Sequence, residues 1–343
     1  MLRTTVPWMA PARRCRRAWA SVSLVVGVCV LLAACGNSND SGAGSAAGGS
    51  KLIILELPFP CGLNNFAKDM CDGAKAAEKH FPAGYSLQVK TAADYNDQGA
   101  FNSLVQKSLQ LKPAGLLVFA NGAAAQTPFL NQGCEQGVKV IFVDTAGTGV
   151  KCQISFVTAP NKEMGAAAAK YLIEHPAPGG SKKAIVVSQQ PGLFNSNDER
   201  VAGFKETIEA AGYKVVQTVV TSNDVTKTRT AVTNAVTAHP DVEAVFSANG
   251  PMGNGTEQAL LEQPEIIQLT MDGNATDIPS ILKGSVAANV AQSPYEDAKV
   301  AAELMVKAIE GESVPKFMPT PIKVIDKSNA QAYLDAGGSL RAE

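Results

Sequence analysis

Short apolar runs that are typical of β-strands alternate with amphipathic helical patterns along nearly the whole chain after residue 50. Parallel strands need a crossover between them, and a helix after each strand supplies it. The order of these segments therefore predicts an α/β fold, in which doubly wound parallel sheets carry helices on both faces. The predicted strands span 51–57, 86–91, 115–120, 138–143, 184–188, 213–220, 244–247, 267–271 and 286–290, and the predicted helices span 64–80, 97–111, 124–136, 198–211, 225–238, 255–261, 277–283 and 295–310.

Two pieces of this pattern recur at a constant offset. The string that ends in Asn121 recurs at Asn249, and the string that ends in Asp144 recurs at Asp272, each 128 residues later. Ligands of open parallel sheets bind beyond the carboxyl ends of the strands. Two similar halves that face each other would place those ends on either side of one cleft, so the sequence predicts two lobes with a ligand site between them.

Length and composition limit the classes of protein that fit. The chain has 343 residues, which is typical of about two domains. With 45% hydrophobic and 18% charged residues it is a globular protein. A pI of about 6.3 offers no basic field for phosphates, which argues against a nucleic-acid partner.

The first 34 residues have the pattern of an export signal. All five charges before Cys35 are arginines, and they precede an uncharged 14-residue stretch from Ser21 to Ala34. That stretch is too short to span a bilayer but suits a signal peptide. The string Leu32-Ala33-Ala34-Cys35-Gly36 resembles the lipobox of bacterial lipoproteins, which implies a lipid on Cys35. The alternative is an ordinary secretory signal that is cleaved after Ala34.

Residues 35–50 contain no large apolar side chain, so they predict a flexible tether between membrane and domain. Both tryptophans, Trp8 and Trp19, lie in the predicted signal peptide of residues 1–34. Any ring that packs on a ligand is therefore a phenylalanine or tyrosine, and Phe59, Phe66 and Tyr95 are the candidates beside the cleft.

Four cysteines lie beyond the lipobox. An even number in an oxidising compartment suggests disulfides. Three pairings are possible, and we favour the two that close short local loops. These pairs are Cys61 with Cys71, and Cys134 with Cys152. A zinc site is the rival, but the chain has no CxxC motif and its histidines are scattered, so we expect no metal and no cofactor.

The residues of common catalytic motifs are missing or have plainer explanations. All three histidines precede or nearly precede a proline, so we expect each to cap the C-terminal end of a helix, where an imidazole suits the helix dipole. These are His80, His175 and His239. Hydrolytic triads therefore lack a base, and we expect no enzyme activity. The glycines at 250, 253 and 255 match neither GxGxxG nor a P-loop, and we expect them to shape a loop.

Polar residues that follow the predicted strands are the candidates for the ligand site. They are Asn64, Asp94, Asn121, Asp144, Asn195, Asp198, Arg200, Asn249 and Asp272. Carboxylates, carboxamides and one arginine suit a neutral polyhydroxyl ligand, because hydroxyl groups both donate and accept hydrogen bonds. For Asp97 and Asp277, which open predicted helices, we expect a helix N-cap instead.

Five strings together resemble the periplasmic sugar-binding proteins of ribose-binding type, which are the solute receptors of ABC importers. In order and spacing these strings match the family over more than 200 residues. They are Asp72-Gly73-Ala74, Asp198-Glu199-Arg200-Val201-Ala202-Gly203-Phe204, His239-Pro240-Asp241-Val242-Glu243-Ala244-Val245-Phe246, Asp272-Gly273 and Ala291-Gln292.

The resemblance implies roles for seven residues. Asp144 and Asp272 would accept sugar hydroxyls, and Arg200 would donate to the sugar. Asn249 and Gln292 would complete the polar shell. Asn64 and Phe66 match the family's first loop, where an aromatic ring stacks on the sugar face.

The sequence departs from ribose binders of this family in three places. Thr145 stands where a second arginine is common. The loop from Pro58 to Gly62 carries two prolines and Cys61, and Asn223 stands where a second aromatic residue is expected. These departures argue against ribose itself, while a sugar or polyol remains the expected ligand class.

The resemblance implies a lipid-anchored, extracytoplasmic, monomeric receptor that passes a sugar or polyol to an ABC permease. We expect one lobe to comprise residues 51–157 and 293–322, and the other to comprise residues 160–291 and 323–343, with three crossings of the chain between them. Two alternatives stay open: a sensory receptor for a sugar-like signal, and a secreted enzyme that uses Asp144 and Asp272 as a carboxylate pair.

Overall fold

The computed structural model describes residues 51–95, 97–122 and 124–341. The predicted signal peptide, the predicted tether and Cys35 lie outside the described residues. Two six-stranded sheets form the framework, and the predicted α/β fold with two parallel-dominated sheets is confirmed. In the part of the chain that is described, no helix combines the length and hydropathy needed to span a bilayer.

The first sheet is entirely parallel, with the strand order β11-β5-β4-β3-β1-β2. Its strands are β1 (Lys51–Leu57), β2 (Tyr85–Thr91), β3 (Gly115–Val118), β4 (Lys139–Val143), β5 (Gln153–Thr158) and β11 (Phe317–Pro319). The helices on it are α1 (Asn65–Glu78), α2 (Gln98–Gln110), α3 (Thr127–Glu135) and α9 (Pro294–Ile309). We call this sheet and its helices the first lobe.

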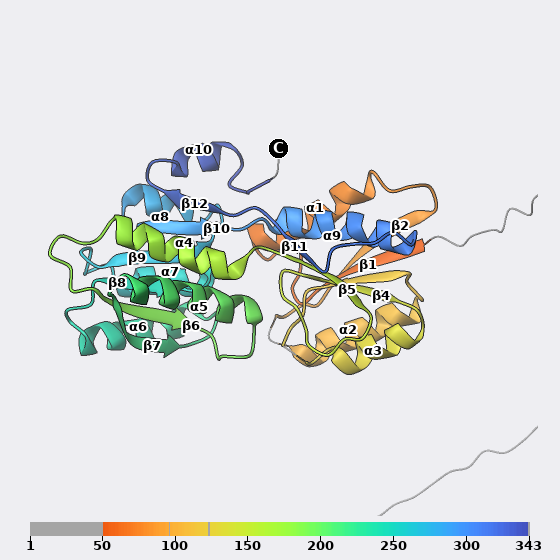
Figure 1. The fold of residues 1–343 in the computed structure, drawn as a ribbon, viewed down its shortest axis with the longest axis horizontal. Helices are drawn as coiled ribbons and strands as arrows, with labels where there is room; N and C mark the ends of the chain where they lie inside the picture. Colours follow the sequence, from red (N-terminus) through yellow and green to blue (C-terminus); the bar gives the residue numbers. More distant parts are fainter. Residues whose placement is uncertain (1–50, 96, 123, 342–343) are drawn as a thin grey trace, which may run out of the picture. The chain divides into compact units, whose positions relative to one another are not determined.

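Side-chain alternation along β1 explains how the first lobe forms two core layers. Ile53 and Leu55 pack with α1 and α9 on one face, whereas Ile54 packs with Phe101 and Leu130 of α2 and α3 on the other. Successive side chains of a strand point to opposite faces, so a continuous apolar strand serves both layers. Figure 1 shows α1 and α9 on one side of this sheet and α2 and α3 on the other.

The second sheet has the order β12-β10-β9-β8-β6-β7, and only β12 runs antiparallel to its neighbour. Its strands are β6 (Lys183–Ser188), β7 (Lys214–Val220), β8 (Ala244–Ser247), β9 (Ile267–Asp272), β10 (Ala288–Ala291) and β12 (Lys323–Asp326). Its helices are α4 (Asn161–Glu174), α5 (Asn195–Ala210), α6 (Val225–Ala238), α7 (Gly250–Ala259), α8 (Ile278–Lys283) and α10 (Ala330–Asp335). We call this set the second lobe.

Glycines set the closest helix contacts. A Cβ atom on Gly165 of α4 would collide with the backbone carbonyl of Arg200 in α5, and one on Gly203 would collide with the carbonyl of Lys162. The two helices therefore touch backbone to backbone. This close contact fixes the position of α5, and with it that of Arg200, relative to α4.

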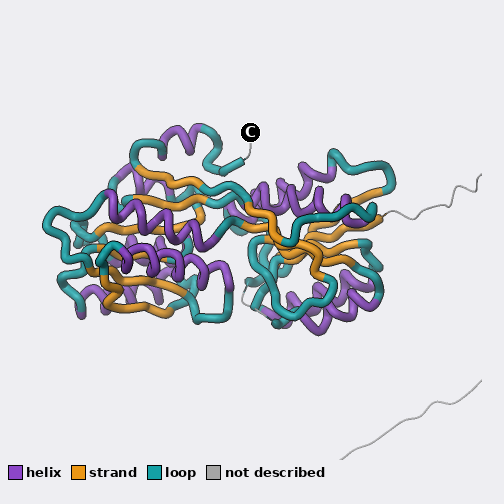
Figure 2. Tube along the Cα trace, in the orientation of Figure 1, coloured by secondary structure: helices purple, strands orange, loops and turns teal. Residues whose placement is uncertain are grey.

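Three segments lead from one sheet to the other, as the tube in Figure 2 shows. They are the links from β5 to α4, from β10 to α9, and from β11 to β12. Two hydrogen bonds near these links tie them to other parts of the fold. Thr158 Oγ1 donates to the carbonyl of Asp144 (2.8 Å), and Thr320 Oγ1 donates to Asp297 Oδ1 (2.6 Å).

Two local expectations are wrong. The helix expected from residue 198 begins at Asn195, so Ser196 and Asn197 belong to its first turn. The glycines expected in a loop lie inside α7. Close packing explains them, because a Cβ on Gly253 would meet Thr270 and one on Gly255 would meet Thr228. Here the need for close approach outweighs the low helix propensity of glycine.

The helix-end expectations have mixed outcomes. His175 and His239 are the C-cap residues of α4 and α6, whereas Lys79 caps α1 and His80 follows it.

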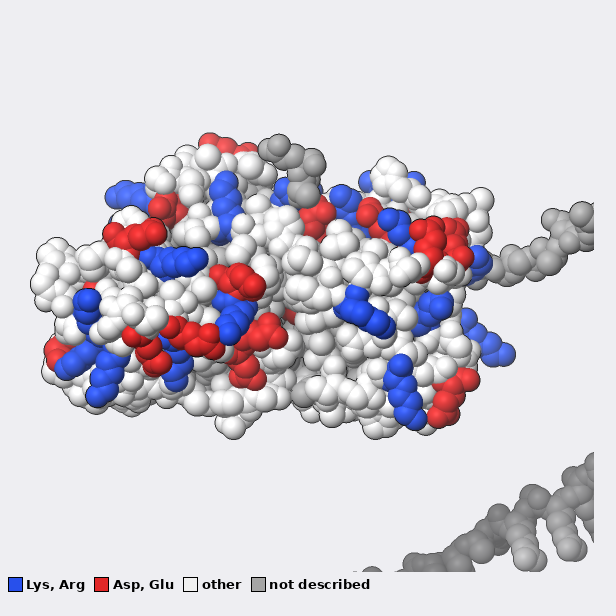
Figure 3. All heavy atoms as spheres, in the orientation of Figure 1, with Lys and Arg blue, Asp and Glu red and all other residues white. Residues whose placement is uncertain are grey.

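On the face of the molecule that Figure 3 shows, basic and acidic side chains are interspersed over both lobes.

Candidate functional site

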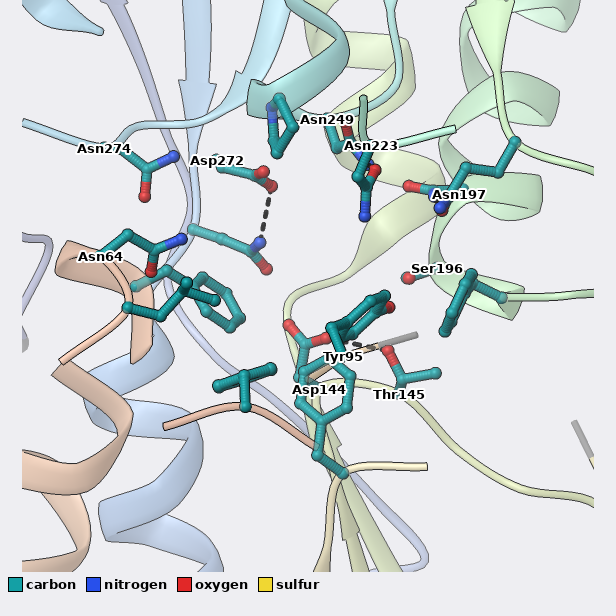
Figure 4. A pocket seen from close by; sticks show the side chains of 18 of the residues that line it. Asn64, Tyr95, Asp144, Thr145, Ser196, Asn197, Asn223, Asn249, Asp272 and Asn274 are labelled. Carbon is teal, nitrogen blue, oxygen red and sulfur yellow. Dashed lines mark hydrogen bonds between the residues drawn. The ribbon is translucent and has the colours of Figure 1, made fainter. Parts of the chain in front are cut away.

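A cavity of about 430 Å³ lies between the lobes, where loops after the strands of both sheets meet. The structure brings all seven residues that the resemblance implied to its wall. These residues are Asn64, Phe66, Asp144, Arg200, Asn249, Asp272 and Gln292. Figure 4 shows carboxylate and amide side chains approaching the cavity from several directions. Among the described residues, no group of three or more His, Cys, Asp or Glu side chains could hold a metal ion.

Arg200 is a buried cation that is held by several protein groups. Its Nη1 lies 2.9 Å from Asp272 Oδ1 and 3.1 Å from the carbonyl oxygen of Ala248, and its Nε donates to Asn161 Oδ1 at 2.8 Å. The side chain is 3% exposed. Since Arg200 lies in α5, Asn161 begins α4 and Ala248 follows β8, three separate segments hold the guanidinium in one plane before any ligand binds.

Asp272 receives hydrogen bonds on both of its oxygens. Oδ1 accepts from Arg200 and from Gln292 Nε2 (2.8 Å), and Oδ2 accepts from the backbone N–H of Gly250 (2.8 Å), the first residue of α7. A carboxylate at a helix N-terminus also meets the positive end of the helix dipole. Asp272 thus organises the second-lobe wall of the cavity.

Asp144 has fewer partners. Its Oδ1 accepts from Thr145 Oγ1 at 2.9 Å, while its Oδ2 is buried and has no hydrogen-bond partner among the described residues. Burial raises the pKa of Asp144, the charge of Arg200 and the Thr145 hydroxyl lower it in part, and the charge of Asp272 raises it further. Asp144, a 5% exposed residue at the cavity wall, therefore has a buried carboxyl oxygen without a hydrogen-bond donor.

Both aspartates lie on unusual backbone. The φ angle is 62° at Asp144 and 84° at Asp272, in the left-handed region that few non-glycine residues adopt. At Asp144 the neighbouring strand holds this conformation, because the Asp144 N–H donates to the carbonyl of Val157 (2.8 Å). Strained backbone of this kind is concentrated at ligand sites.

Two amide side chains have structural partners as well as places in the cavity wall. Asn64 caps α1 by accepting from the Ala67 N–H (2.9 Å), and Asn249 caps α7 by accepting from the Met252 N–H (3.0 Å). Asn249 Nδ2 also donates to Asn223 Oδ1 (2.9 Å). Gln292 keeps a free acceptor, because its buried Oε1 has no hydrogen-bond partner among the described residues.

Aromatic rings cover the first-lobe side. Phe66 is half-buried and meets Phe59 and Phe119 edge to face, with ring centroids 6.0 and 6.3 Å apart. Phe59 stacks near Tyr95 (6.1 Å), and Tyr95 stacks on Phe194 of the second lobe (5.6 Å). The rings line the cavity and also support one another, so Phe66 has both a packing role and a place at the site.

Three polar residues expected near strand ends do not line the cavity. Asn121 is buried and donates from Nδ2 to the Tyr95 carbonyl (2.7 Å). Asn195 Oδ1 accepts from the Ala146 N–H (3.3 Å), and Asp198 accepts from the Gly192 N–H (2.8 Å). The Asp198 contact is local, whereas those of Asn121 and Asn195 join segments distant in the sequence. Asp94 does lie at the cavity wall.

The two aspartates expected as N-caps differ. Asp97 accepts from the Ala100 N–H at 2.8 Å and caps α2, as expected. Asp277 occupies the N-cap position of α8 without a side-chain cap bond. It accepts instead from Asn274 Nδ2 (3.1 Å), because loop contacts compete for the same oxygens.

Several lining residues had no place among the candidates. They are Leu63, Phe119, Gln189, Phe194, Ser196, Asn197, Pro251 and Asn274. Ser196 and Asn197 were missed because the start of α5 was placed too late. Gln189 follows β6 directly, so the rule of polar residues after strands could have found it.

The structure pairs Cys61 with Cys71 and Cys134 with Cys152. The first bond ties the loop after β1 to α1, close to Phe66 in the sequence. The second ties the C-terminal end of α3 to the loop between β4 and β5. Both bonds lie in the first lobe.

Comparisons with known proteins find relatives of the same architecture. The ribose import binding protein of Salmonella typhimurium is 28% identical over 269 residues, which covers 77% of this chain and 88% of that protein. The ribose import binding protein of Bacillus subtilis is 27% identical over 230 residues, covering 67% and 74%. An ABC transporter solute-binding protein from Mycobacterium smegmatis, solved with bound glycerol, has a TM-score of 0.75 at 25% identity and covers 86% of this chain and 100% of its own.

The family model described as the periplasmic binding protein domain matches residues 59–313. That range includes most of both sheets and every cavity residue discussed above. The chain belongs to the periplasmic binding protein domain family.

Proposed function

We propose that this protein is a lipid-anchored, extracytoplasmic solute-binding protein that captures a sugar or polyol for an ABC importer. One observation carries the proposal: the cavity combines fixed donors and acceptors with a wall of aromatic rings. The donors and acceptors around Arg200 and Asp272 suit hydroxyl groups, and the rings suit the C–H faces of a sugar.

The relatives support the ligand class. Two of them are ribose import proteins, and one solved relative from Agrobacterium radiobacter, with a TM-score of 0.75, is in complex with D-arabinose. Because two of these relatives are named ribose import binding proteins, they also support the transport role in this proposal. The cavity itself holds no catalytic motif that we recognise, and binding followed by release is the activity we propose.

Ligand capture would use the two-lobed architecture. We propose that residues 51–157 and 293–322 move as one lobe and residues 160–291 and 323–343 as the other. Three chain segments between the sheets support hinge closure around a ligand. The free energy of binding would then drive closure, and no covalent bond would change.

A panel of pentoses, hexoses, deoxysugars and polyols tests the ligand class. A true ligand at about 100 times its dissociation constant should stabilise the fold by about 2.7 kcal/mol, which a thermal-shift assay detects. Analysis of the same mixtures for products tests catalysis. Failure of every compound to bind would refute the proposed ligand class, and turnover would refute a pure binding role.

The membrane anchor is tested by replacing Cys35. Because the thiol would accept the lipid, Cys35→Ala should abolish lipid labelling and cleavage before residue 35. Mass spectrometry of the N-terminus and membrane fractionation measure both. Processing of the variant at the same bond, with retention in the membrane, would refute the lipoprotein proposal. Reconstitution with the cognate permease, as opposed to pulldown of a sensor kinase, separates transport from sensing.

A further inference from the structure

The binding of a neutral polyol does not fully account for Asp144, whose carboxyl has an oxygen without a hydrogen-bond partner among the described residues. The residue is 5% exposed, and this oxygen, Oδ2, is buried. A buried anion is costly unless it meets a cation or several donors. Because Asp144 lies at the cavity wall, a ligand in the cavity can supply the missing partner.

Carboxyls outnumber cations around the cavity. Among the described residues that line it, Arg200 is the one cation, against Asp144 and Asp272, and against Asp94, which has an interaction of its own. Arg200 Nη1 is already paired with Asp272 Oδ1 at 2.9 Å. The residue next to Asp144 is the uncharged Thr145, which supplies only a hydroxyl.

A further buried carboxyl lies behind the wall. Asp297 of α9 is fully buried, and its pKa is raised by burial and by the charge of Asp144. Thr320 donates to its Oδ1, whereas its Oδ2 has no partner among the described residues. The surroundings of Asp144 therefore include two further carboxyls, Asp272 and Asp297, and a single nearby cation, Arg200.

The ring nearest to Asp144 adds an independent argument. Figure 4 shows Tyr95 beside Asp144 and Thr145, and burial raises the pKa of the Tyr95 phenol, as do the charges of Asp144 and Asp272. Tyr95 stacks on Phe194 with centroids 5.6 Å apart, and both rings line the cavity. Aromatic faces attract cations as well as sugar C–H groups.

These observations favour a positively charged ligand group over a neutral or a negative one. A carboxylate or phosphate would face excess negative charge and find no free cation. A neutral hydroxyl could donate to the Asp144 carboxyl but would leave its charge offset by Arg200 alone. A protonated amine supplies both a donor and a charge.

We propose that the ligand is an amino sugar or amino polyol whose ammonium group binds the Asp144 carboxyl beside the Tyr95 ring. This inference rests on the proposed binding of a polyhydroxyl solute and narrows its class. The hydroxyl groups of such a ligand would meet the polar side chains of the second-lobe wall. Gln292, whose Oε1 is free, is one acceptor for them.

Matched pairs of compounds test the charge requirement. The pairs are D-glucose with D-glucosamine, D-galactose with D-galactosamine, and D-glucitol with 1-amino-1-deoxy-D-glucitol. Isothermal titration calorimetry at neutral pH should show that the amine binds about tenfold more tightly than the hydroxyl analogue in at least one pair, because hydrogen bonds to charged groups are the stronger ones. N-acetyl-D-glucosamine, which has the nitrogen but no charge, should lose this advantage.

Two isosteric variants locate the effect. Asp144→Asn keeps the shape of the side chain and removes its charge. The variant should bind the amine about tenfold more weakly, which abolishes the preference, and its affinity for the neutral analogue should change much less. Asp198→Asn removes one charge from a residue outside the cavity wall and should leave both affinities unchanged. Thermal melting of each variant verifies that it is folded.

Each result has a distinct meaning. If the neutral member of every pair binds as well as the amine or better, the amine inference is wrong and the polyol proposal stands. If an amine is preferred but Asp144→Asn keeps that preference, the assignment to Asp144 is wrong. If no compound binds at millimolar concentration, both the inference and the proposed ligand class are refuted.

Discussion

Asp144 and Asp272 occupy corresponding places in the two lobes and have opposite surroundings. Asp144 follows β4 and Asp272 ends β9, and both have left-handed backbone. Asp272 accepts from Arg200, Gln292 and the N–H of Gly250, so both of its oxygens are occupied. The Asp144 carboxyl accepts from Thr145 alone among the described residues, and its other oxygen has no hydrogen-bond partner there.

The difference shows that a repeated position does not keep a repeated role. The second lobe uses its aspartate to brace a polar wall. The first lobe leaves its aspartate available and surrounds the cavity with rings. The asparagine pair differs in the same way, since Asn249 lies at the cavity wall while Asn121 supports the Tyr95 backbone from behind.

Replacing each aspartate by asparagine gives the sharpest test of this difference. Asp272→Asn leaves the buried Arg200 without its ion partner, so the free energy of unfolding should fall by about 3–5 kcal/mol. Asp144→Asn removes a charge that burial already disfavours, and the unfolding free energy should stay the same or rise. Chemical denaturation without ligand measures both. Equal losses in the two variants would show that the aspartates have equivalent roles.

The two disulfides are a second difference between the lobes, because both bonds lie in the first lobe. Replacing either pair by serines should lower the unfolding free energy by about 3 kcal/mol, since each bond restricts the unfolded chain. Non-reducing peptide mapping should find Cys61 joined to Cys71 and Cys134 joined to Cys152. Four alkylatable thiols in the native exported protein would contradict this pairing. If reduction leaves the unfolding free energy unchanged, the disulfides do not make the first lobe different from the second in stability.

A buried glutamate gives the first lobe a pH dependence. Burial raises the pKa of Glu56 on β1 from 4.5 to about 7, although the nearby Ser108 hydroxyl and the Lys90 charge oppose the shift. The folded state therefore holds this proton more tightly than the unfolded state. Its contribution to stability is complete below pH 4.5 and is lost as the pH rises through about 7.

Glu56→Gln should remove this dependence. Above pH 7 the variant should be more stable than the parent by about 3 kcal/mol, because it no longer has to bury a charge. Urea denaturation at a series of pH values measures the effect. Parallel pH profiles for the two proteins would show that Glu56 titrates normally.

The aromatic wall provides the smallest predicted change. Phe66→Ala should weaken ligand binding by about tenfold and lower stability by about 2 kcal/mol, because the half-buried ring both packs and faces the cavity. Phe101→Ala is the control, since this ring is fully buried away from the cavity wall. It should cost about 3–5 kcal/mol of stability with unchanged affinity. A purely structural loss in Phe66→Ala would exclude its ring from the site.

Local pattern predicted much of this molecule. The β1 run of residues 51–57 and the α1 pattern that follows it were recognisable, because periods of two and of about 3.6 residues are written directly in the chain. Element boundaries were less certain, as the early start of α5 and the glycines within α7 show. In α7 the decisive fact is contact with Thr270 and Thr228, which no local propensity encodes.

Parallel sheets with polar residues at their carboxyl ends could be predicted from the alternation of strand and helix segments along the chain and from the repeat that relates Asp144 to Asp272. Which aspartate is braced and which keeps a free oxygen could not. That outcome depends on Arg200, Gln292 and the start of α7, which come from separate parts of the chain and meet at Asp272 only after the sheets have assembled.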